Sequence, residues 1–73
     1  MRLIMERVSV SSSNIRAIGY DSSTSTLEVE FTTGSIYQYH DVPQSEFDAM
    51  LNAESKGRYF SANIRNNYPY AKL

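Results

Sequence analysis

The feature that most constrains the fold is an alternating segment at positions 26–31, with the sequence TLEVEF. Leu27, Val29 and Phe31 alternate with Glu28 and Glu30, so apolar and acidic side chains point to opposite sides of an extended chain. A period of two over this length is typical of a β-strand with one buried face. The segment therefore predicts a sheet that is covered on one side, with both glutamates facing solvent.

The glycine that follows this strand sets the register of the next strand, at 36–40. A two-residue loop would bring Val29 opposite Gln38, whereas a three-residue loop with a left-handed Gly34 in a bulge would pair Val29 with Tyr37. Only the second register gathers the apolar side chains of both strands on one face, and a glycine suits the bulge position. We therefore predict that Tyr37 and Tyr39 face the core.

Three strands and two helices are predicted along the chain. The strands cover 15–20, 26–31 and 36–40. One helix begins at Pro43 or at Ser45, with Ser45 and Asp48 as a capping box, and a second covers about 58–66. The order β-β-β-α-α predicts an α+β domain, a three-stranded antiparallel meander with two helices packed on one face. The predicted core residues are Ile18, Tyr20, Leu27, Val29, Phe31, Tyr37, Tyr39, Phe47, Met50, Leu51, Phe60 and Ile64, and the predicted solvated sheet face carries Glu28, Glu30, Gln38 and His40.

The length of 73 residues, without cysteine, fits one small domain in a reducing compartment. The N-terminus has too few consecutive apolar residues for a signal peptide or a membrane span, so we expect a cytoplasmic protein without a membrane partner. The sequence does not determine the oligomeric state, and we favour a monomer. We assign 11–70 to a single domain, 1–10 to a partly ordered N-terminal segment and 71–73 to a tail. A lone histidine and no cysteine predict no metal site, and no cofactor is expected.

Charge is divided along the chain although the net charge is only −1. Seven carboxylates and no Lys or Arg lie between Ala17 and Glu54, and four cations and no carboxylate lie from Ser55 to Leu73. The cations are interleaved with aromatic residues. Such a surface suits phosphates or an acidic partner.

The predicted anion site begins at Lys56-Gly57-Arg58, where two cations and the free N–H groups of a helix start converge. On an ideal α-helix, Arg58 and Arg65 lie on one face, opposite Phe60. Two alternatives stay open: Gly57 only turns the chain, or the arginines pair with carboxylates of the protein itself. The predicted nucleic-acid- or anion-binding residues are Lys56, Gly57, Arg58, Tyr59, Arg65 and Tyr68.

An ordered series of short motifs resembles the KTSC domain, a family named for its occurrence at the C-terminus of some lysyl-tRNA synthetases. The resemblance extends over about 10–70 and implies a stand-alone bacterial member of a family of unknown function, for which RNA binding has been suggested. The motifs are SSNI at 12–15, IGYD at 18–21, LEVEF at 27–31, Gly34 with YQY at 37–39, VP at 42–43, SKGRYF at 55–60, IR at 64–65 and YP at 68–69.

We expect a small non-catalytic binding module. The first hypothesis is weak binding of RNA, either tRNA or another polyanion, through the basic aromatic C-terminal region. The alternative is a protein–protein interaction module that uses the same region or an exposed sheet edge. No catalytic residue is predicted, because His40 and Asp41 are adjacent on an extended segment and point to opposite faces, which prevents a catalytic relay.

Overall fold

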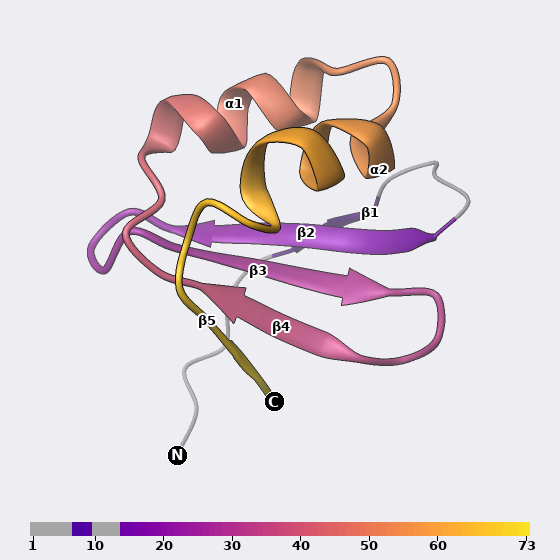
Figure 1. Ribbon diagram of the computed structural model, residues 1–73, viewed down its shortest axis with the longest axis horizontal. Coiled ribbons are helices and arrows are strands. Elements are labelled where there is room, and N and C mark those ends of the chain that lie inside the picture. Colours follow the sequence, from indigo (N-terminus) through magenta and orange to yellow (C-terminus); the bar gives the residue numbers. More distant parts are fainter. Residues whose placement is uncertain (1–6, 10–13) are drawn as a thin grey trace.

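A computed structural model describes residues 7–9 and 14–73 of the chain. A five-stranded antiparallel sheet has the order β1-β2-β3-β4-β5, and two helical segments cover one of its faces (Figure 1). The class is α+β, as predicted. The strands are β1 Arg7–Ser9, β2 Ile15–Asp21, β3 Thr26–Phe31, β4 Ile36–Tyr39 and β5 Tyr70–Lys72, and the helices are α1 Gln44–Asn52 and α2 Lys56–Tyr59, which continues as the π-helix η1 Phe60–Ile64.

Two short edge strands extend the predicted three-stranded meander. β1 pairs with β2, and β5 returns from the helical layer to pair with β4, placing Tyr70 opposite Tyr39. The prediction of three strands is therefore incomplete. β5 covers the edge of β4, which the three-stranded prediction leaves exposed. Ala71 and Lys72 therefore belong to the sheet, although we predicted them to form a C-terminal tail. Three-residue strands are too short to show a clear period of two.

The hairpin between β3 and β4 has the predicted register. The Gly34 amide donates to Phe31 O at 2.9 Å, the Phe31 amide donates to Ser35 O at 2.9 Å, and Gly34 has a φ of 94°. Val29 lies opposite Tyr37, as expected. The left-handed glycine therefore directs the tyrosines of β4 toward the helices.

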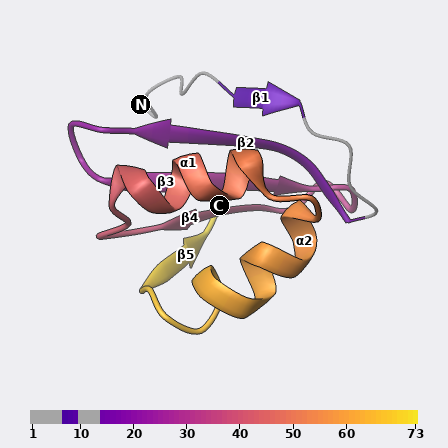
Figure 2. The same ribbon diagram turned by 90° about the horizontal axis from the view of Figure 1, so that it is seen from above.

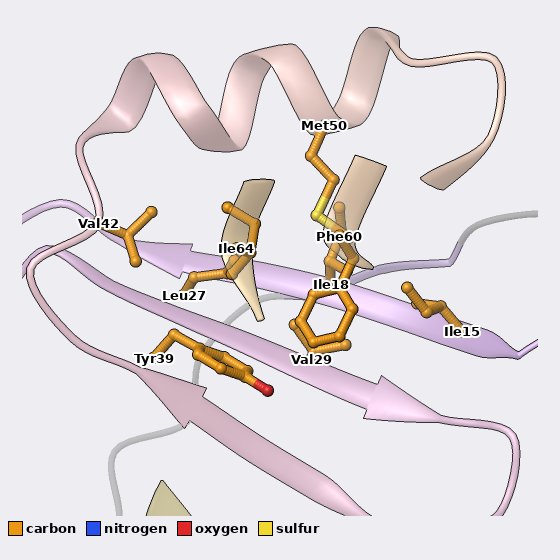
Figure 3. Close-up of a cluster of buried hydrophobic side chains, with 9 residues drawn as sticks. All are labelled: Ile15, Ile18, Leu27, Val29, Tyr39, Val42, Met50, Phe60 and Ile64. Carbon is orange, nitrogen blue, oxygen red and sulfur yellow. The ribbon is translucent and has the colours of Figure 1, made fainter. Parts of the chain in front are cut away.

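The core lies between the sheet and the helices (Figure 3). Of the predicted core residues, five lie at its periphery and are only partly buried: Tyr20, Phe31, Tyr37, Phe47 and Leu51. The prediction omitted Ile15 and Val42, both fully buried. The buried cluster consists of Ile15, Ile18, Leu27, Val29, Tyr39, Val42, Met50, Phe60 and Ile64.

Glu28 corrects the prediction of a solvated outer face. Its relative exposure is 0 %, and it accepts a hydrogen bond from Gln38 Nε2 at 2.9 Å. Glu28 lies on the central strand, between Gly19 of β2 and Gln38 of β4. A carboxylate buried there requires hydrogen-bonding groups around it. Glu30 lies nearer the strand end and forms an ion pair with Arg16 at 3.2 Å.

The helix starts differ in how they are capped. Pro43 precedes α1 and provides no side-chain cap, so the predicted capping box at Ser45 is wrong and Ser45 lies inside the helix. Ser55 caps α2, accepting a hydrogen bond at Oγ from the Arg58 amide at 3.2 Å. The predicted second helix at 58–66 is instead a short α-helical turn followed by a π-helix.

We expect Gly34→Ala to lower the free energy of unfolding by about 1–2 kcal/mol, because a side chain at positive φ is strained even though the space around Gly34 is open. Thr33→Ala in the same exposed turn is the matched control and should change stability by less than about 0.5 kcal/mol. Urea denaturation measures both variants. Equal stability of the two would contradict the assignment of this turn.

Candidate ligand-binding site

The π-helix separates the two arginines that an ideal α-helix would place on one face. The Arg65 amide donates to Phe60 O at 3.0 Å, an i to i+5 bond. One extra residue in a turn rotates the following side chains by about 100° relative to an α-helix. Arg65 consequently lines the same pocket as Phe60, and the prediction that it lies with Arg58 on the opposite face is wrong.

The start of α2 is occupied by contacts within the protein. Lys56 Nζ donates to Ala53 O at 2.8 Å. Gly57 is buried, and a Cβ atom there would lie 2.5 Å from Asn14 Oδ1. Gly57 therefore allows a close approach to Asn14, the residue before β2, and it lies inside α2 rather than in a turn of the chain.

Glu46 joins the first helix to the C-terminal segment. The hydroxyls of Tyr59 and Tyr68 each donate to one of its carboxylate oxygens, the Tyr68 bond being 3.0 Å long. The hydrogen bond from Tyr59 to Glu46 is the main cause that raises the pKa of Tyr59 to about 12. Burial, followed by its own hydrogen bond to Glu46, raises the pKa of Tyr68. Both rings are partly buried. The two predicted ligand-contacting tyrosines thus connect α1 to α2 and to the segment that follows η1.

Arg58 and Arg65 are exposed. In residues 14–73, whose side chains the structure describes, no salt bridge or hydrogen bond involves either guanidinium. Arg16 differs, because its guanidinium pairs with Glu30 and donates to Thr32 O at 3.3 Å. Within the described part of the chain, the two C-terminal arginines remain available to a ligand.

A pocket of about 440 Å³ opens beside Arg65. It lies between the β3–β4 turn, strands β4 and β5, and the helical segment that follows α2. Seen from above, β5 and this helical segment lie on the same side of β4, the side away from β3 (Figure 2). We call it the aromatic pocket. Its lining residues are Asn14, Phe31, Thr32, Thr33, Ser35, Tyr37, Tyr39, Phe60, Ser61, Arg65, Asn66 and Tyr70.

Five rings in contact form the apolar part of the aromatic pocket. Phe60 meets Phe31 and Tyr39 edge-on, each with a centroid distance of 5.4 Å. Tyr70 lies 5.7 Å from Tyr37 and 5.5 Å from Tyr39. Tyr39 is buried and points its hydroxyl away from Val42 (Figure 3), whereas Tyr70 is 58 % exposed. Tyr39 thus lies deep in this cluster, and Tyr70 provides an exposed ring at its edge.

The electrostatics of the aromatic pocket favour a neutral or anionic ligand. Arg65 is the charged residue of the lining, and no carboxylate is among the lining residues. Burial raises the pKa of Tyr39, the neighbouring Tyr37 and Tyr70 raise it further, and Arg65 lowers it. At neutral pH the Tyr39 phenol is therefore uncharged, and one cation, Arg65, lies beside a cluster of planar rings.

The site predicted from the sequence includes Arg65 but omits Tyr70, Asn66 and the polar residues of the β3–β4 turn. Tyr37 and Tyr39 were assigned to the core, yet both also line the aromatic pocket. The interleaving of aromatic and basic residues after Ser55 was the available signal, and it pointed to the segment that contains Arg65, Asn66 and Tyr70. The missing information was that β5 returns to β4 and carries Tyr70 to the site.

The family model of the KTSC domain matches residues 11–68. The chain belongs to the KTSC domain family. A crystal structure of a KTSC domain protein from Yersinia pestis, 38 % identical, superimposes with a TM-score of 0.92 and covers 96 % of this chain and 99 % of that one.

Sequence relatives show the KTSC domain in two contexts. An uncharacterized protein of Stutzerimonas stutzeri is 46 % identical over 70 residues, which is 94 % of this chain and 99 % of that protein. A lysine–tRNA ligase of Nostoc sp. is 43 % identical over 59 residues, which is 81 % of this chain but 10 % of the ligase. These relatives indicate no catalytic class for the domain.

Two further observations concern the part of the chain that the structure describes. Among the helices that the structure describes, none has the length and apolarity to cross a membrane. The described residues also hold no group of three or more His, Asp or Glu side chains that could bind a metal ion.

The Tyr59–Glu46 contact predicts alkaline sensitivity. A folded-state pKa of about 12, against an ordinary 10.0, favours the neutral phenol in the folded state. Its stabilising contribution is complete below about pH 10 and is lost as the pH rises toward 12. In an absorbance titration of tyrosinate, Tyr59→Phe should remove a step near pH 12, and Glu46→Gln should move that step toward 10. A Tyr59 that titrates near pH 10 in the unaltered protein would contradict the contact.

Proposed function

We propose that this KTSC domain is a non-catalytic module that binds RNA weakly through its C-terminal region. The observation that carries the proposal is the position of Arg65, an exposed cation at an aromatic pocket whose lining has no carboxylate. Aromatic rings next to cations are the usual means of binding single-stranded nucleic acid. The related segment within lysine–tRNA ligases adds support, because the name of that enzyme specifies tRNA.

Weak affinity follows from the charge. The chain has a net charge of −1, whereas dedicated nucleic-acid-binding domains are usually strongly basic. Two exposed arginines, with Lys56 and Lys72 nearby in sequence, can contact only a few phosphates. The proposal places the protein in the cytoplasm, where tRNA is found, as a monomer.

A second candidate is protein binding at β5. Tyr70 and Leu73 are the large hydrophobic residues that remain most exposed in the described part of the chain, at 58 % and 52 %. β5 is also an edge strand of the sheet and can pair with an added strand. Such binding would depend on salt much less than phosphate contacts do.

Fluorescence anisotropy with labelled tRNA at several salt concentrations tests the proposal. The slope of log affinity against log salt should be about −2 to −4, because only a few phosphates are neutralised. Arg58→Gln and Arg65→Gln should each reduce the magnitude of the slope by about 1. Arg16→Gln is the matched control and should leave the slope unchanged, because Glu30 already neutralises Arg16.

Two results would count against the proposal. If tRNA does not bind at low salt, RNA is not the ligand and the protein-binding candidate at β5 takes its place. If tRNA binds with the same slope in both arginine variants, the phosphate contacts lie elsewhere on the domain.

A further inference from the structure

We propose that the aromatic pocket receives one unstacked nucleobase of an RNA strand and that Arg65 contacts a neighbouring phosphate. This inference rests on the proposed RNA binding and specifies how it occurs. It assigns a ligand role to Tyr70, Asn66 and Ser61, which the charge pattern alone does not identify. The phosphate contacts of Arg58 then lie outside the pocket, because Arg58 is not among its lining residues.

The size and the rings of the pocket fit a planar group. Its volume of about 440 Å³ is in the range of small-ligand sites, about 300–1,000 Å³. Tyr70 touches Tyr37 and Tyr39 and still exposes 58 % of its surface, so a flat ligand can lie against its ring. Stacking on aromatic side chains tolerates any base, because each base has a π-face.

Polar side chains at the rim fit the edge of a base. Asn66 and Ser61 are exposed and line the pocket. In the part of the chain whose side chains are described, no hydrogen bond involves either side chain. An amide supplies both a donor and an acceptor, and a hydroxyl supplies either, which matches the mixed hydrogen-bonding groups of a base edge.

Charge selects among ligands that carry planar groups. Arg65 immediately precedes Asn66 and supplies positive charge to the lining, to which no carboxylate contributes. A cationic ligand would be repelled here, whereas a base joined to phosphates offers both a flat apolar surface and negative charge. Arginine binds phosphate oxygens through its planar guanidinium.

The test compares a short oligouridylate with an abasic oligoribonucleotide of the same length and charge, at one low salt concentration. We expect the base-bearing oligomer to bind about tenfold tighter, since stacking of one base contributes a factor of that order. Tyr70→Leu keeps an apolar side chain in β5 but removes the ring, and it should abolish the difference. Tyr70→Phe keeps the ring and should preserve it.

A second variant avoids any change in the sheet. Ser61→Leu adds a bulkier side chain without a ring at an exposed position of η1 that lines the pocket, and it should also remove the preference for the base-bearing oligomer. Thermal melting verifies that each variant is folded.

The outcomes separate the two proposals. Equal affinity of the unaltered protein for both oligomers would overturn the base pocket and leave RNA binding through phosphates intact. A base preference that persists in folded Tyr70→Leu and Ser61→Leu would also overturn it, because the base would then lie elsewhere. Failure of both oligomers and of tRNA to bind would overturn the pocket and the proposed function together.

Discussion

Gly34 determines on which face of the sheet Tyr37 and Tyr39 lie, because a loop one residue shorter would turn every side chain of β4 to the other face. The positive φ of Gly34 allows the three-residue turn, and Tyr39 then lies opposite Leu27 on the helix side. Packing of Phe60 on Tyr39 depends on this register, as does the contact of Tyr39 with Tyr70. The core and the aromatic pocket are therefore two consequences of one turn.

The basic aromatic C-terminal region divides into a structural and an exposed part. Tyr59 and Tyr68 donate hydrogen bonds to Glu46 and thereby connect α1 to the C-terminal region, and Gly57 packs closely against Asn14. Arg58 and Arg65 remain exposed, and the π-helix directs Arg65 to the pocket. The same segment thus stabilises the fold and presents the groups that we assign to ligand binding.

The sequence was sufficient for features with a strong local pattern. Alternation at 26–31 and the glycine turn predicted the central hairpin and its register, because both signals are contained within a few residues. Family resemblance identified the KTSC domain from ordered motifs. The apolar positions Phe60 and Ile64 were also correctly placed in the core.

Features that depend on tertiary contacts could not be predicted in the same way. The change from α- to π-helix at Phe60 has no distinct sequence signal. For this reason the predicted position of Arg65, on the same helix face as Arg58, was wrong. Glu28 alternates with apolar residues in β3 and was therefore predicted to face solvent, yet its relative exposure is 0 %. Alternation within one strand does not show what covers the polar face of the sheet. β5 is too short for periodicity, and its return to β4 is what completes the pocket.

The central claim is that RNA contacts the aromatic pocket, and the most direct measurement is an amide chemical-shift titration of the protein with tRNA. We predict concentration-dependent shifts at Thr33, Ser61, Arg65, Asn66 and Tyr70. The turn between β2 and β3, at the opposite end of the hairpins (Figure 1), should remain unchanged. Shifts that are absent at low salt, or that occur only away from the pocket, would contradict the account.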